Sequence, residues 1–187
     1  MKFQLIATAT LLAFIGLTEQ AFAFNQLDLD QLKATGSCPR CDLSGADLSR
    51  LNLTGANLRG SNLKTAILTG ANLTNADLTS ANLESATLTG ANLSGTFFTG
   101  AYLKGASLDN TNLSFTGFIG ANLEGANLKG AREQLTNYRG ANFRVTTLPN
   151  GVITSNKPYW WSLQRFSGGA CNKFDDNNIN GSTCFAE

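Results

Sequence analysis

Every fifth residue of this 187-residue chain is a large apolar residue over more than a hundred positions. Between Leu43 and Leu148, 21 of the 22 positions in this register are Leu, Phe or Tyr, and Glu133 is the exception. The residue two positions earlier is Ala in 14 repeats and Thr in five. The pattern fits neither the 3.6-residue period of an amphipathic helix nor the alternation of a half-buried strand. Repetition this regular predicts a solenoid.

A repeat of five residues holds one short extended piece and one tight corner. If each repeat turns the chain by a quarter circle, four repeats close a square coil and residues 20 apart stack. The central apolar residue and the small residue two before it then point inward. Gly is frequent at the fifth place, which suits a turn with unusual backbone angles. Glu133 is expected to turn outward through a local bulge in AREQLTNYRG.

Columns of residues spaced by 20 support the square coil. One inward column becomes aromatic: Leu58, Leu78, Phe98, Phe118 and Tyr138. One outward column alternates in charge, as a ladder of ion pairs requires: Ser44, Lys64, Glu84, Lys104, Glu124 and Arg144. Another outward column is a ladder of hydroxyl groups: Thr54, Thr74, Ser94 and Ser114. These regularities exist only at a spacing of 20, so they are independent of the five-residue count.

The pattern A-(D/N)-L-x-x, as in ADLSR, ANLRG, ANLTN and ADLTS, closely resembles the motif of pentapeptide repeat proteins. The resemblance covers residues 41–148 and implies an all-β fold, a right-handed quadrilateral β-helix with four repeats per coil. It is specific for the fold and nearly silent about function, because members of the family have diverse roles. The segment QLKATGSCPRCDLSGADL also resembles the start of the repeat region in exported members of the family from photosynthetic bacteria. That resemblance implies a location in the periplasm or the thylakoid lumen.

The sequence divides into four parts. Lys2, the apolar run FQLIATATLLAFIGL and the small residues ending at Ala23 predict a signal peptide that is cleaved after Ala23. An uncleaved membrane anchor is the alternative, but the run is shorter than the roughly 20 residues of a spanning helix. We expect residues 1–23 to be the signal peptide, 24–40 an N-terminal helical cap, 41–148 the repeat β-helix, and 149–187 a C-terminal cap or tail.

Both ends of such a rod expose hydrophobic core and unpaired backbone, so caps are expected. At the N-terminal end, NQLDLDQLK predicts a short helix that places Leu29 and Leu32 over the first coil. At the other end, Pro149 and Gly151 break the repeat, and PYWWSLQRF supplies aromatic residues to cover the last coil.

Four cysteines, an even number, fit disulfides in an oxidising compartment, and three pairings are possible. The ends of the predicted rod are roughly 26 Å apart, whereas bonded cysteines need Cα atoms within about 7 Å. We therefore favour Cys38–Cys41 and Cys171–Cys184. Cys38 and Cys41 also have the spacing of a thiol–disulfide oxidoreductase or half a zinc site. No thioredoxin-like or zinc-site pattern accompanies them, so we expect a structural role.

The tail matches the calcium-loop pattern D-x-[DN]-x-[DN]-G-x5-E through Asp176, Asn178, Asn180 and Glu187. Cys184 lies inside the loop, and only two carboxylates would bind the ion. We therefore expect a chance match, with no metal site and no cofactor.

Apolar residues at outward positions are the best candidates for a partner site. Phe97, Tyr102 and Ile119 stand where other repeats have Asn, Thr or Lys, and Phe115 replaces a corner Gly or Asn. The repeat places them on two successive coils around neighbouring edges. Exposed apolar patches often mark partner sites. The alternative is that these side chains cover one another and add modestly to stability.

Histidine is absent and no nucleophile–base pair is evident, so we expect no enzyme. The net charge of +1 gives no support for binding to nucleic acid or anionic membrane.

We expect a non-enzymatic exported structural or interaction protein, with an unknown protein partner, no membrane contact after signal cleavage, and a monomeric or weakly dimeric state. One alternative is a redox- or calcium-dependent binding protein. The family resemblance adds another, a DNA mimic that binds gyrase through an acidic rod, but the neutral exterior and the export signal argue against it.

Overall fold

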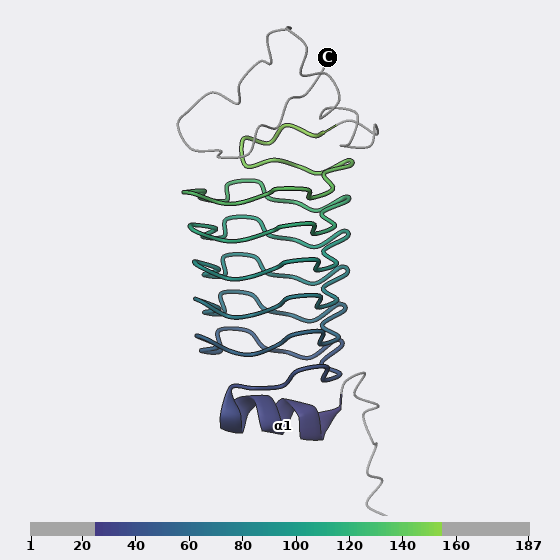
Figure 1. Cartoon of the computed structure of the whole chain (residues 1–187), viewed down its shortest axis with the longest axis vertical. Coiled ribbons are helices and arrows are strands. Elements are labelled where there is room, and N and C mark those ends of the chain that lie inside the picture. Colours follow the sequence, from purple (N-terminus) through teal and green to yellow (C-terminus); the bar gives the residue numbers. More distant parts are fainter. Residues whose placement is uncertain (1–24, 155–187) are drawn as a thin grey trace, which may run out of the picture.

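Each pentapeptide forms a short extended piece followed by a tight turn, and four of them complete one coil of a rod (Figure 1). The computed structural model describes residues 25–154. In a representative turn, the N–H of Ala46 donates to the carbonyl of Leu43 at 3.0 Å, and Gly45 between them has a φ of 71°. These are the features of a type II turn, which needs a positive φ at its third residue.

Parallel pairing between residues 20 apart joins successive coils. Asp42 pairs with Asn62, and the same pattern runs up the rod to Asn127 and Thr147. The N–H of Leu43 donates to the carbonyl of Asn62 at 2.8 Å, for example. Within residues 25–154 these are single-residue bridges rather than longer strands, because each side of a coil is only five residues long. The 20-residue spacing confirms the predicted square coil.

The core consists of the central apolar residues and the small residues two positions earlier, all along the rod. The threonines in the small slots keep their hydroxyl groups satisfied, as when Thr96 donates to the carbonyl of Leu73 at 2.7 Å. Phe98 and Phe118 stack with ring centroids 5.0 Å apart, and Phe118 and Tyr138 stack at 5.1 Å. The predicted aromatic column is therefore confirmed.

Helix α1 (Gln26–Thr35) lies across the N-terminal end of the rod (Figure 1). The side chain of Asn25 caps its first turn by accepting from the N–H of Leu27, and Gly36 ends it with a φ of 67°. Leu29 and Leu32 are buried in the core. No helix in the described part of the chain is both long and apolar enough to cross a bilayer.

The coils begin one pentapeptide before residue 41. Ser37 already pairs with Asn57, and Cys38 fills a fully buried central slot. This first repeat is not evident in the sequence because a cysteine replaces the usual leucine. At the other end, Thr147 pairs with Ile153 in antiparallel fashion, so the parallel ladder stops there among the described residues. The predicted signal peptide and residues 155–187 lie outside the described part.

Glu133 stays partly buried in its central slot instead of turning outward. Its carboxylate accepts a hydrogen bond from the hydroxyl of Tyr138, the next central residue along the chain. Burial raises the pKa of the Glu133 carboxyl above its ordinary value, and the hydrogen bond from Tyr138 opposes that shift only in part. The backbone bends at Gln134 and Leu135, without the expected outward bulge.

Candidate functional site

Two neighbouring sides of the rod carry most of the departures from the repeat pattern. We name the first the aromatic face, after its central residues Leu58, Leu78, Phe98, Phe118 and Tyr138. The chain then turns a corner onto the second, which we name the charged face. Its central residues are Leu43, Leu63, Leu83, Leu103, Leu123 and Phe143.

Four exposed apolar side chains lie on the aromatic face and at the corners on either side of it. We call them the apolar patch: Phe97, Phe115, Ile119 and Leu135, with exposed fractions of 53%, 55%, 42% and 44%. Phe97 lies one coil below Gly117, with which its backbone pairs. Phe115 and Ile119 lie two residues before and two residues after that glycine in the same coil. The N–H of Phe115 donates to the carbonyl of Gln134 at 2.7 Å, which places Leu135 over Phe115 in the next coil.

Gly117 leaves space in the middle of the apolar patch. It is the only glycine at the position just before a central residue in the 22 repeats between residues 41 and 150. A Cβ built there would meet a single neighbouring side chain within 4 Å, the ring of Phe97 at 4.0 Å. The position is therefore open above the Phe97 ring, which an incoming apolar group would contact.

Tyr102 lies apart from this patch, on the charged face. It is 58% exposed and pairs with Asn82 below and Asn122 above. Together with Glu84 and Lys104 these residues line a shallow open groove. The structure thus brings together three of the four predicted partner residues and leaves Tyr102 around the corner.

Leu135 and Gly117 were missed in the sequence, although the 20-residue count contains both. Leu135 follows Phe115 by 20 residues, and Gly117 follows Phe97 by 20. Glycine is so common in this chain that Gly117 gives no signal by itself in the sequence. Its effect on the surface depends on the Phe97 ring one coil below it.

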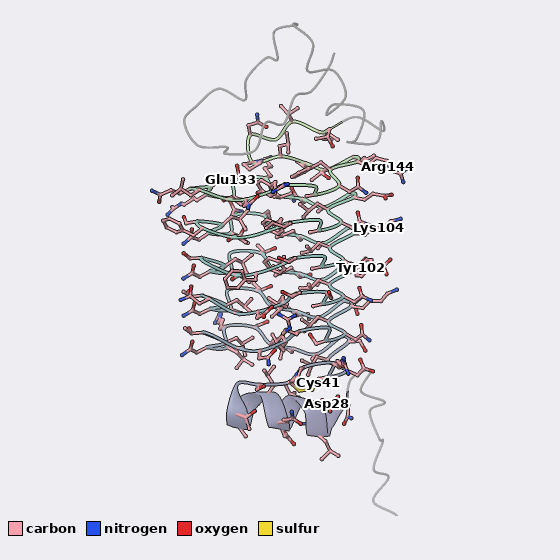
Figure 2. The ribbon with its side chains drawn as sticks, viewed as in Figure 1. Asp28, Cys41, Tyr102, Lys104, Glu133 and Arg144 are labelled. Atoms are coloured by element: carbon pink, nitrogen blue, oxygen red, sulfur yellow. A yellow bond between two sulfur atoms is a disulfide. The ribbon has the colours of Figure 1, made fainter. Side chains whose placement is uncertain are left out.

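The ladder of charges on the charged face forms at three of its four steps. Lys64 pairs with Glu84 at 3.0 Å, and Lys104 pairs with Glu124 at 3.3 Å. Arg144 also pairs with Glu124. Its hydrogen bond lowers the pKa of the Glu124 carboxyl. Figure 2 shows Tyr102, Lys104 and Arg144 along one side of the rod.

The two N-terminal cysteines are joined in the first coil, next to helix α1. Cys38 and Cys41 form a disulfide with Cα atoms 5.4 Å apart, and both residues are buried. Figure 2 shows Cys41 beside Asp28 of the helix. Asp28 accepts a hydrogen bond from the N–H of Asp42 at 2.7 Å, which ties the helix to the same coil. Burial of the sulfur atoms does not favour exchange with an external thiol.

The remaining predicted site residues belong to the tail. Residues 25–154 contain no group of three or more Cys, Asp or Glu side chains that could hold a metal ion. The second cysteine pair and the calcium-loop candidates lie outside the described residues: Cys171, Cys184, Asp176, Asn178, Asn180 and Glu187.

Known proteins that this chain resembles include pentapeptide repeat proteins. Curated protein sequences include no match to this chain. Rfr23, a pentapeptide repeat protein from the cyanobacterium Cyanothece 51142, is 31% identical over 62% of this chain and 92% of its own, with a TM-score of 0.41. A pentapeptide repeat protein from the Arabidopsis thaliana thylakoid lumen is 36% identical over 63% of this chain and 72% of its own, with a TM-score of 0.27.

QnrB1, a plasmid-mediated fluoroquinolone resistance protein, is 23% identical over 68% of this chain and 83% of its own, with a TM-score of 0.41. That likeness concerns the fold alone. The family described as Pentapeptide repeats matches in 8 copies, over residues 37–64, 56–95, 66–105 and 98–132. These matches span more than half of the chain, which therefore belongs to the pentapeptide repeat family, whose fold is a right-handed quadrilateral β-helix.

Proposed function

We propose that this chain is a non-enzymatic, exported protein-interaction module of the periplasm or thylakoid lumen. The observation that carries the proposal is the apolar patch, which stands on a rod whose other outward columns are mostly polar. Exposed apolar groups that cluster on a rigid surface are typical of partner sites. Residues 25–154 contain ten Lys or Arg and nine Asp or Glu, so a strongly acidic exterior does not account for function.

Backbone conformation at the corner supports a functional reason for the patch. Phe115 and Leu135 have φ values of 60° and 54°, in the left-handed region. A bulky side chain there costs roughly 1–2 kcal/mol. Gly95 and Gly55 occupy the same corner column one and three coils below Phe115 and adopt this conformation freely. Two bulky residues in successive coils of one corner column thus carry a backbone cost, which is explained if their side chains bind a partner.

We further infer that the rod is protected at both ends. At the N-terminal end, helix α1 buries Leu29 and Leu32 against the first coil, and the N–H of Asn25 donates to the carbonyl of Asp42 at 3.0 Å. For the other end we propose that residues 149–187 form a cap with a Cys171–Cys184 disulfide. An unprotected end would invite pairing with another chain.

Export is supported by the predicted signal peptide of residues 1–23 and by the disulfide between Cys38 and Cys41, a bond that persists in oxidising compartments. Mass spectrometry of the protein expressed in a bacterial host would test this. We expect a periplasmic product that begins at Phe24. A product retained in the cytoplasm with its N-terminus intact would contradict export.

The interaction function is tested by affinity capture from the compartment of origin. The variant Phe97→Asn/Phe115→Gly replaces both rings by residues found elsewhere in the same columns, so the fold should persist. The matched control is Ile67→Thr, which removes an exposed apolar side chain from another side of the rod, in a column where Thr87 already stands. We expect the first variant to lose a partner that wild type and Ile67→Thr retain. Identical partners in all three would contradict the proposal.

A further inference from the structure

We propose that the apolar patch binds an acidic segment of a partner protein. A large apolar side chain of that segment fills the space over Gly117, and its carboxylates pair with Arg132 and Arg139. The proposal rests on the interaction function above and specifies the chemistry of the partner.

The first argument is the shape of the patch. Interface hot spots are large side chains that enter well-packed, desolvated positions. Here the exposed ring of Phe97 lies one coil below Gly117, and Phe115 and Ile119 precede and follow that glycine by two residues. Because Gly117 has no side chain, a partner group can reach the Phe97 ring directly. No other residue in that outward column of the aromatic face is a glycine: Asn57, Asp77, Phe97 and Asn137.

The second argument is the placement of two arginines one coil above Phe115 and Ile119, in the coil of Leu135. The N–H of Gly120 donates to the carbonyl of Arg139 at 2.9 Å, so Arg139 stands over Ile119. Arg132 pairs with Asn112 on the other side of the Phe115 corner. Both arginines are exposed, and neither forms an ion pair with any residue between 25 and 154. The two arginines therefore lie in the coil that follows Phe115 and Ile119, one before and one after Leu135 along the chain.

The third argument is the charge balance around these arginines. After Glu124, the described chain contains four cationic residues, Lys129, Arg132, Arg139 and Arg144. Its one acidic residue there is Glu133, which is partly buried and accepts a hydrogen bond from Tyr138. Below the patch, Asp77 is already paired with Arg59 at 2.7 Å. The described chain after Glu124 thus carries a net positive formal charge.

These features select an acidic protein segment over other anionic partners. Guanidinium groups pair with carboxylates through two parallel hydrogen bonds, which fixes orientation as well as charge. Recognition of an anionic membrane typically uses clusters of 4–8 cationic residues, whereas among residues 25–154 two arginines lie near this patch. The patch is also compact, which suits one anchoring side chain.

The test uses two peptides of about twelve residues with a central phenylalanine. In the acidic probe glutamates surround the phenylalanine, and in the matched probe lysines replace the glutamates. Binding to the full chain is measured by isothermal titration calorimetry. Gly117→Asn fills the space with the residue found at Asn57 and Asn137 of the same column, and Arg132→Glu/Arg139→Glu reverses the charge. Tyr102→Asn and Lys129→Glu are the controls, since they change an exposed aromatic and an exposed cation elsewhere.

We expect the acidic probe to bind wild type and both controls equally, and the lysine probe not to bind. Gly117→Asn and the double arginine variant should each weaken binding by about tenfold or more. Failure of the acidic probe to bind at millimolar concentration would overturn the proposal. Equal binding of both probes, lost in Gly117→Asn, would overturn the acidic chemistry while leaving the interaction surface in place.

A second measurement identifies other occupants. A photoreactive benzoylphenylalanine at position 115 of the full chain is irradiated, and the cross-linked peptides are sequenced. Cross-links to the acidic probe support the proposal. Cross-links to residues 155–187 in the presence of the probe, or to a second copy of the chain, would overturn it in favour of those occupants. Binding of anionic phosphatidylglycerol vesicles that depends on the same arginines would also overturn it, in favour of a membrane.

Discussion

The hydroxyl of Tyr138, on the aromatic face, donates a hydrogen bond to the carboxylate of Glu133, the central residue of the preceding side of the same coil. Burial raises the pKa of both groups, and for Tyr138 the neighbouring carboxylate raises it further. Glu133 is the one acidic residue among 22 central positions. Stability near this end of the rod therefore depends on the protonation of one side chain.

The first prediction concerns pH. Because folding raises the pKa of Glu133 above its unfolded value of about 4.3, its contribution to stability is fully present below that pH. It is lost as pH rises through the folded pKa. We expect Glu133→Gln, which keeps an acceptor for Tyr138, to raise the free energy of unfolding by about 1 kcal/mol at pH 7 and by little near pH 4.

Urea denaturation at both pH values measures this difference. Glu84→Gln removes an exposed carboxylate from the charged face and serves as the control, for which we expect no such gain at pH 7. A Glu133→Gln variant that is equally stable relative to wild type at both pH values would contradict the prediction.

The second prediction concerns the aromatic stack. Phe118 lies between Phe98 and Tyr138, with interplanar angles of 4° and 8°. Phe118→Leu should cost about 1–2 kcal/mol, because it loses the ring contacts but places a residue that the same column holds at Leu58 and Leu78. Phe118→Ala should cost about 3–5 kcal/mol through the cavity it leaves. Chemical denaturation compares them, and equal costs would show that the column cannot repack around leucine.

The third prediction separates stability from function at the corner. Because Phe115 adopts a positive φ, Phe115→Gly should raise the free energy of unfolding by about 0.5–1 kcal/mol while abolishing binding at the apolar patch. Thermal denaturation and titration with the acidic probe measure the two effects on one sample. A variant that is more than about 1 kcal/mol less stable than wild type would show that Phe115 serves mainly to stabilise the fold.

The fourth prediction concerns the disulfide of the first coil, next to helix α1. The bond closes a loop of only a few residues, since Cys38 and Cys41 are separated by three positions. Cys38→Ala/Cys41→Ala should therefore lower the free energy of unfolding by about 2 kcal/mol without unfolding the coils. Urea denaturation measures the loss, and circular dichroism reports whether the coils remain. A loss of the β-helix spectrum in buffer would contradict this prediction.

Much of the fold could be predicted because each five-residue repeat contains the same local pattern of inward residues and turn. One inward pair and one turn, repeated without a break, define the coil, and the count of 20 assigns each residue to a column. The count placed Phe98 in the core and Phe97 at the surface, and the structure agrees on both. It also predicted the stacking of Phe118 and Tyr138, because residues 20 apart lie in contact.

The candidate site depended on contacts that the count does not describe. Tyr102 lies around a corner from Phe97, although only five residues separate them, while Leu135 lies over Phe115. Gly117 leaves an open position because the Phe97 ring is the side chain found within 4 Å of it. Cys38 fills the central, buried slot of the first coil, which its residue type does not indicate. The hydrogen bond that Glu133 accepts could not be predicted, because it depends on the position of the Tyr138 hydroxyl in the folded rod.

The sequence alone thus determined the period, the square coil and the division between inward and outward residues, since these follow from local patterns that every repeat restates. Only the tertiary structure decided which outward side chains meet, which space is left open, and which charges remain without a partner among the described residues. The physical reason is that these properties arise between coils and around corners, where the direction of each side chain and the size of its neighbour set the contact.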